Sequence, residues 1–170
     1  MKITYTFYLM NGSMNVILSL SQYDIDSIYF YESIDNNIIK DGEFIKLYYS
    51  NDFFSMNGLY LNITQNNYKY ESYFQNPEKY VVNVQFNNYV SDKLKTIEQK
   101  ILEKINISNA PSYRLNDQID NKSIKLYSKN NTFTSILLKI SGIWKVNETY
   151  GITYKFIPIC DPPIFQQSVG

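Results

Sequence analysis

Lysines and aromatic residues lie near each other in the segment 136–156, close to the end of the chain. Ammonium groups can contact backbone phosphates, and flat rings can stack on bases with about 1–3 kcal/mol for each base. Residues of the same kinds occur on other candidate strands at Lys46, Tyr48 and Tyr60. We therefore predict a site for single-stranded nucleic acid, and its main residues are Lys139, Trp144, Lys145, Tyr150, Tyr154 and Lys155.

The same residue types allow two other interpretations. Trp144 and the tyrosines could belong to the protein core, which would leave the lysines as ordinary solvated strand residues. Tyr and Trp are also common in protein interfaces, so Tyr-rich strands could instead drive self-assembly of a structural protein. The sequence alone does not choose between these interpretations, because it does not say which face of each strand is buried.

The residues typical of catalysis are scarce. The chain has no His, and Cys160 is its only cysteine, which removes His-based nucleophile systems, internal disulfides and Cys-rich zinc sites. The closely spaced acid pairs 24/26 and 117/120 lie in polar segments that are typical of solvated turns. We expect no enzyme, no metal and no cofactor, and the least favoured alternative is a small hydrolase or nuclease that uses Asp117 or Asp120.

Charge and length limit the class of protein. A chain of 170 residues suits a single domain, 1–170, whose last residues, 161–170, we expect to be loose. Sixteen basic and sixteen acidic residues give zero net charge, which argues against avid, non-specific binding to DNA. Arg114 is the only arginine, so cationic contacts would come mainly from lysines, which favour phosphates over bidentate reading of bases.

Hydrophobic periodicity predicts a β-rich chain with one prominent helix. Asn11-Gly12 predicts a hairpin between strands at 3–10 and 14–20, and further strands are expected at 44–50, 58–64, 80–86, 123–127, 134–144 and 150–159. A stripe of Leu94, Ile97, Ile101 and Ile105 predicts a helix over 92–106. The charged residues of that helix should face solvent, namely Lys93, Lys95, Glu98, Lys100, Glu103 and Lys104.

The last two strands are predicted to form a hairpin with strict alternation. One face of the first strand would carry Gly142 and Trp144, and the other would carry Lys139, Ser141 and Lys145. The return strand would contribute the tyrosines at 150 and 154 to one face and Lys155 to the other. This pattern brings lysines close to rings on a β surface.

No apolar run approaches the roughly 20 residues of a membrane span, and the first 20 residues lack a cleavage pattern typical of a signal peptide. We expect an intracellular protein that does not contact membranes.

Four segments carry a resemblance, in this order: 50–63 (SNDFFSMNGLYLNI), 97–105 (IEQKILEKI), 113–127 (YRLNDQIDNKSIKLY) and 138–156 (LKISGIWKVNETYGITYKF). Together they resemble a family of small proteins encoded by large nucleocytoplasmic DNA viruses, the giant viruses. The closing hairpin is also similar to that of phage-type and viral OB-fold single-stranded DNA-binding proteins. The resemblance implies a mainly β fold with one prominent helix, in an OB-like antiparallel barrel or sandwich with extra N-terminal strands.

For function, the resemblance implies a viral single-stranded nucleic-acid-binding protein, with single-stranded DNA as its partner. The alternative is a virion-associated or structural protein that forms homo-oligomers or contacts virion components through Tyr-rich β surfaces. Such a protein would act in the host cytoplasm or the viral factory, or in the virion.

Overall fold

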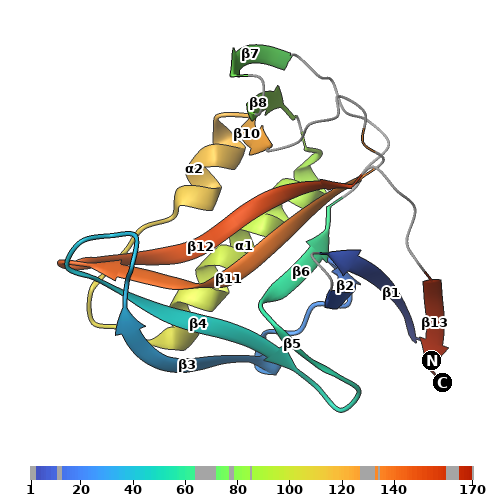
Figure 1. Cartoon of the computed structure of the whole chain (residues 1–170), viewed down its shortest axis with the longest axis horizontal. Helices are drawn as coiled ribbons and strands as arrows, with labels where there is room; N and C mark the ends of the chain where they lie inside the picture. Colours follow the sequence, from blue (N-terminus) through green and yellow to red (C-terminus); the bar gives the residue numbers. More distant parts are fainter. Residues whose placement is uncertain are drawn as a thin grey trace.

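The computed structural model describes residues 3–10, 13–63, 72–76, 79–84, 86–126, 133, 135–159 and 165–169. This part of the chain is mainly β, with two α-helices and one short 3-10 helix (Figure 1). Its strands are β1 (Ile3–Met10), β2 (Ser13–Ser19), β3 (Ile28–Asp35), β4 (Gly42–Ser50), β5 (Ser55–Asn57), β6 (Leu59–Asn62), β7 (Ser72–Asn76), β8 (Lys79–Asn83), β9 (Ala110–Pro111), β10 (Ser123–Leu126), β11 (Ser135–Val146), β12 (Thr149–Ile159) and β13 (Phe165–Val169). The helices are η1 (Ile25–Ser27), α1 (Asn88–Ile105) and α2 (Arg114–Asp120).

The described strands join in one mixed, open sheet. Its path runs β13-β1-β2-β6-β11-β12-β10-β8-β7, and β3, β4, β5 and β9 pair with strands beside this path. Most neighbours are antiparallel, but β2 pairs with β6, and β12 with β9 and β10, in parallel. The mainly β prediction is confirmed, whereas a closed OB-like barrel is not confirmed by this open sheet.

The two ends of the chain lie side by side. β1 pairs with β2 as the sequence predicts, with Met10 opposite Ser13, and the predicted turn at 11–12 lies outside the described residues. On its other edge β1 pairs with β13, so residues 165–169 form a strand where a loose tail was expected. Figure 1 accordingly places both termini at the same edge.

Helix α1 forms where the apolar stripe predicts it. The helix begins at Asn88, earlier than expected, because the Asn87 side chain accepts a hydrogen bond from the Val90 amide at 2.9 Å and caps it. It ends at Ile105, and the C-cap residue Asn106 adopts the left-handed conformation with φ of 51°. Its buried side includes Leu94, Ile97, Ile101 and Leu102.

One charged residue of α1 does not face solvent. Glu98 is completely buried, and its carboxylate accepts hydrogen bonds from the backbone amides of Leu115 at 2.9 Å and Asn116 at 2.8 Å. Burial raises the pKa of Glu98, and these two hydrogen bonds act in the opposite direction. The prediction that Glu98 is exposed is therefore wrong, because its carboxylate satisfies the first amides of α2, a helix that periodicity did not predict.

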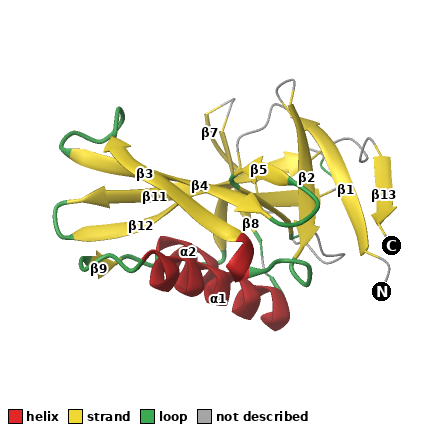
Figure 2. Cartoon of the chain, turned by 90° about the horizontal axis from the view of Figure 1, so that it is seen from below, coloured by secondary structure: helices red, strands yellow, loops and turns green. Residues whose placement is uncertain are grey.

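Both helices lie against the same face of the β3–β4–β11–β12 part of the sheet (Figure 2). The main core forms between them and includes Leu47, Ile143 and Ile152 from the strands and Leu94 and Ile101 from α1. We call the opposite face of these four strands the outer face. In the described part of the chain no helix packs against it (Figure 2).

A β-bulge at Ser141 breaks the predicted alternation of β11. Ile140 lies opposite Tyr154, but Gly142 lies opposite Thr153, so Ser141 has no directly opposite residue on β12. Consequently Ile140 before the bulge and Ile143 after it both point to the helices. A Cβ at Gly142 would lie 2.3 Å from the Ile45 carbonyl oxygen, so β4 can approach only a glycine here.

Candidate functional site

Two of the rings predicted to stack on bases are buried. Tyr150 is 5% exposed, and its hydroxyl donates a hydrogen bond to the Leu102 carbonyl at 3.2 Å. Trp144 is 7% exposed, and the guanidinium of Arg114 lies over its ring at 4.2 Å. The structure does not support the expectation that these rings have open faces for stacking on bases, because α1 packs on Tyr150 and Arg114 of α2 covers Trp144.

Tyr154 and Tyr60 are also occupied by intramolecular contacts. The Tyr154 hydroxyl lies 2.7 Å from the Gln118 Oε1 and 3.1 Å from the Arg114 carbonyl oxygen, and burial raises its pKa to about 12. Tyr60 is 5% exposed, and the ammonium of Lys139 lies 5.0 Å from its ring centroid. Tyr60 therefore presents no open face to a base, and the hydroxyl of the partly buried Tyr154 is held by α2.

The lysines of the closing hairpin do not share one face. Residues directly opposite each other on neighbouring strands project to the same side of a sheet. Lys139 lies opposite both Tyr60 and Lys155, whereas Lys145 lies opposite Tyr150, which packs on α1. Because the bulge at Ser141 reverses the alternation, Lys145 points to the helix side.

The positive charge of Lys145 is also neutralised on the helix side. Its ammonium pairs with the Glu43 carboxylate at 2.8 Å, and this hydrogen bond, together with one from Ser33, lowers the pKa of Glu43. Lys145 therefore does not belong to a common trough with the other two lysines.

Lys139 and Lys155 remain as uncompensated positive charge on the outer face. Two like charges directly opposite each other on a sheet are destabilising. Neither ammonium forms an ion pair with any residue that the structure describes. Lys46 is on the same face. It lies opposite Gly142 on β11, and Gly142 lies opposite Thr153 on β12. Thr153 is two residues from Lys155 on β12, so the two side chains project to the same side. Three of the predicted lysines are thus brought together.

The exposed rings of the outer face come from β3 and β4. Tyr29 and Tyr48 lie directly opposite each other, and their rings stack with centroids 5.3 Å apart and an interplanar angle of 22°. The Tyr31 ring lies 4.7 Å from that of Tyr48. Tyr29 is 46% and Tyr31 52% exposed. We call Tyr29, Tyr31 and Tyr48 the tyrosine cluster.

An ammonium group lies at each end of the tyrosine cluster. The Lys46 Nζ is 5.6 Å from the Tyr31 ring centroid, and the Lys104 Nζ is 5.8 Å from that of Tyr29. Lys104 comes from α1 and also donates to the Ile25 carbonyl at 2.9 Å. Lys46 and Tyr48 were predicted from the sequence, whereas Tyr29, Tyr31 and Lys104 were not. The available signal was the spacing Tyr-x-Tyr at 29–31 and Lys-x-Tyr at 46–48 on neighbouring strands.

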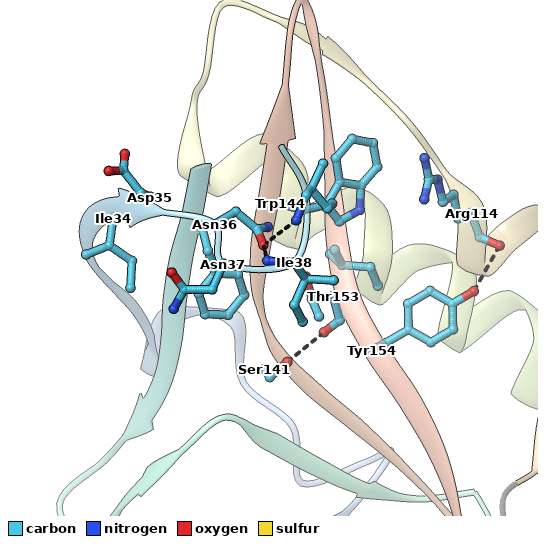
Figure 3. A pocket seen from close by; sticks show the side chains of 13 residues that line it. Ile34, Asp35, Asn36, Asn37, Ile38, Arg114, Ser141, Trp144, Thr153 and Tyr154 are labelled. Carbon is cyan, nitrogen blue, oxygen red and sulfur yellow. Dashed lines mark hydrogen bonds between the residues drawn. The ribbon is translucent and has the colours of Figure 1, made fainter. Parts of the chain in front are cut away.

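Beside the lysines the outer face is hollowed into a pocket of about 650 Å³. The pocket lies between the β3–β4 loop and the closing hairpin (Figure 3). Its lining residues are Ile34, Asp35, Asn36, Asn37, Ile38, Ile39, Phe44, Arg114, Ser141, Trp144, Ile152, Thr153 and Tyr154.

At least one carboxylate of each acid pair noted in the sequence has a structural partner. Asp24 caps η1 by accepting from the Asp26 amide at 3.1 Å, and Asp120 pairs with Lys95. Within the described ranges, no three His, Cys, Asp or Glu side chains come close enough to hold a metal ion. No helix among the described residues is both long and apolar enough to cross a membrane.

Comparison with family models, curated proteins and solved structures found no match to this chain. The geometry of the outer face therefore carries the functional argument.

Proposed function

We propose that the protein binds single-stranded nucleic acid on its outer face, with the tyrosine cluster stacking on bases and Lys46, Lys139 and Lys155 contacting phosphates. The observation that carries the proposal is the row of three adjacent tyrosine rings, two of them about half exposed, with an ammonium group at each end. Single-stranded nucleic acid is bound by this combination of flat rings and positive charge.

The register of the strands supports a continuous path for the ligand. Lys46 lies two residues from Tyr48 on β4, so the two side chains share the outer face. Across β11, Lys139 and Lys155 continue the positive charge toward β12. A strand that stacks on the tyrosine cluster would therefore meet further cations beyond Lys46.

Zero net charge is compatible with this local site. Of the nearby acidic residues, Glu43 pairs with Lys145 on the helix side, and the Asp26 carboxylate lies 4.0 Å from the Lys104 ammonium at one end of the tyrosine cluster. Three phosphate contacts predict that log K falls with log salt with a slope of about −2. Binding should therefore be moderate in strength and clearly salt-dependent.

The proposal retains the viral source that the four segments suggested and the OB-like relationship that segment 138–156 suggested. The features compatible with the OB-like relationship are a single long helix, α1, and a long closing hairpin, β11–β12, which forms the centre of the sheet. A protein of this kind would act in the host cytoplasm or the viral factory.

The test is a titration of fluorescein-labelled oligo-dT at about 50 mM salt, followed by fluorescence anisotropy. The triple variant of the tyrosine cluster, Tyr29→Ala, Tyr31→Ala and Tyr48→Ala, should weaken binding at least 30-fold, the lower end of stacking on two bases. Tyr89→Ala is the matched control, since Tyr89 is 52% exposed and has Lys93 at 5.8 Å but lies on α1. Equal affinity of both variants would refute the proposal.

A second candidate function is self-association through the outer face. One observation favours it: among the described strands β3 pairs only with β4, and it exposes two tyrosines beside a free edge. Sedimentation equilibrium distinguishes the two functions, because assembly in the absence of oligonucleotide, lost in the triple variant, would indicate a structural or virion-associated protein.

A further inference from the structure

The structure also assigns a second binding site to this chain, independent of nucleic acid. We infer that the pocket beneath the β3–β4 loop binds a small amphipathic anion, with an aromatic or aliphatic body and one carboxylate or sulfonate. Three features carry this inference: the size and apolar lining of the pocket, an unpaired arginine at its wall, and isoleucines that are exposed at its rim.

The pocket has the dimensions and the lining of a small-molecule site. Its volume of about 650 Å³ lies within the range of roughly 300–1,000 Å³ that is usual for such sites. Phe44, Ile39, Trp144 and Ile152 supply apolar lining, with the hydroxyls of Ser141 and Thr153 among them. The Ser141 hydroxyl donates to the Thr153 carbonyl at 3.2 Å, so the bulge itself forms part of the wall.

Arg114 supplies the positive charge. Its guanidinium stacks on Trp144 at 4.2 Å, and its own carbonyl accepts a hydrogen bond from Tyr154 at 3.1 Å, so both ends of the residue are held. It forms no ion pair within the part of the chain that the structure describes. The acidic lining residue, Asp35, points its carboxylate away from Arg114 (Figure 3). A held, unpaired guanidinium favours a planar oxyanion over a neutral ligand.

The end of β3 and the β3–β4 loop place apolar side chains in water at the rim of this pocket. Ile38 is 94% exposed and Ile34 59% exposed, which is unfavourable for large apolar groups. The loop is nevertheless held in shape, since the Asn36 Oδ1 accepts from the amides of Ile38 at 2.9 Å and Ile39 at 3.1 Å (Figure 3). A ligand with an apolar body would remove this surface from water, and its anionic end would reach Arg114.

The test uses the fluorescent aromatic anion 1-anilinonaphthalene-8-sulfonate and its uncharged relative N-phenyl-1-naphthylamine. Trp144 is the only tryptophan, so quenching of its emission reports binding at this pocket. We expect one sulfonate probe per chain, with quenching of Trp144. Arg114→Gln should weaken binding of the sulfonate probe about tenfold and binding of the uncharged probe less than twofold. Lys155→Gln, on the outer face but outside the pocket, is the matched control and should change neither.

A second variant keeps the inference falsifiable if the arginine variant is unstable. Ile38→Ser replaces an almost fully exposed side chain, so it should leave the unfolding midpoint unchanged. It should weaken binding of both probes about threefold. Failure of the sulfonate probe to bind, or equal binding by the native chain and both variants, would overturn the inference. The triple variant of the tyrosine cluster should bind the probe normally, so this site and the proposed nucleic-acid site can fail separately.

Discussion

The tyrosine cluster and the closing hairpin present the same residue types in opposite environments. Tyr29 and Tyr31 lie on an outermost described strand and are about half exposed, whereas Tyr150 and Trp144 lie on central strands and are nearly inaccessible. The difference arises from what packs on each ring: α1 lies over Tyr150 and Arg114 lies over Trp144. A ring on a strand therefore has an open face for stacking on a base only where no residue of a helix packs on it.

The lysines divide in the same way. Lys145 has a carboxylate partner on the helix side, but Lys139 and Lys155 face each other on the outer face. Unpaired charge and uncovered rings thus occur together on the outer face. The following predictions test that division.

We expect the largest effect from Glu98→Ala, which acts on the helix side. The change leaves the amides of Leu115 and Asn116 without an acceptor inside the protein. An unsatisfied buried group costs about 1–3 kcal/mol, so the free energy of unfolding should fall by about 3 kcal/mol. Urea denaturation followed by circular dichroism measures it, and a loss below about 1 kcal/mol would contradict the role of this carboxylate.

Glu98→Gln is the companion variant, because it keeps one acceptor and removes the charge. Burial raises the pKa of Glu98 in the folded protein above its ordinary value, so the native state binds the proton more tightly than the unfolded chain. Stability from this group is present at low pH and is lost as the pH rises through the raised pKa. The stability of the native chain relative to Glu98→Gln should therefore fall as the pH rises across the carboxyl range.

Gly151→Ala should have the next largest effect and should open the covered tryptophan. A Cβ at Gly151 would lie 2.7 Å from the Trp144 ring and 2.9 Å from the Ser112 carbonyl oxygen. Overpacking of this kind costs about 1–3 kcal/mol. We expect a loss of about 2 kcal/mol in urea denaturation together with stronger quenching of Trp144 by acrylamide. Thr153→Ala, two residues away on β12, should change stability by less than about 0.5 kcal/mol.

Tyr31→Ala and Tyr150→Phe compare the two environments directly. Tyr31→Ala should weaken oligo-dT binding by about 1–2 kcal/mol and leave stability within about 0.5 kcal/mol, since Tyr31 is exposed. Tyr150→Phe loses the hydrogen bond to Leu102, so it should cost about 1 kcal/mol of stability and leave binding unchanged. Fluorescence anisotropy and urea denaturation of both variants measure these effects. Loss of stability in Tyr31→Ala together with loss of oligo-dT binding in Tyr150→Phe would contradict the comparison.

Lys155→Glu should give the smallest effect on stability, and in the favourable direction. It replaces a pair of like charges directly opposite each other by an ion pair with Lys139, which should stabilise by about 0.5 kcal/mol. The salt dependence of oligo-dT binding should become less steep by about 0.7, the contribution of one phosphate contact. Unchanged salt dependence would remove Lys155 from the proposed site.

Local patterns predicted several elements correctly. The apolar stripe of α1 and the hairpin β1–β2 follow from periodicity and turn residues close in sequence. Helix α2 was not predicted, because the carboxylate that caps it, Glu98, lies sixteen residues before its first helical residue, Arg114. The bulge at Ser141 was also missed, because it depends on how β4 and β12 approach β11.

The sequence by itself determined that the chain is mainly β, that one long amphipathic helix packs on the strands, and that lysines and rings occur close together. Only the tertiary structure decided which rings remain open and which lysines remain unpaired. The physical reason is that exposure depends on contacts between segments far apart in the chain, such as Arg114 over Trp144 and Leu102 beside Tyr150. Periodicity describes one strand at a time, so it does not contain those contacts.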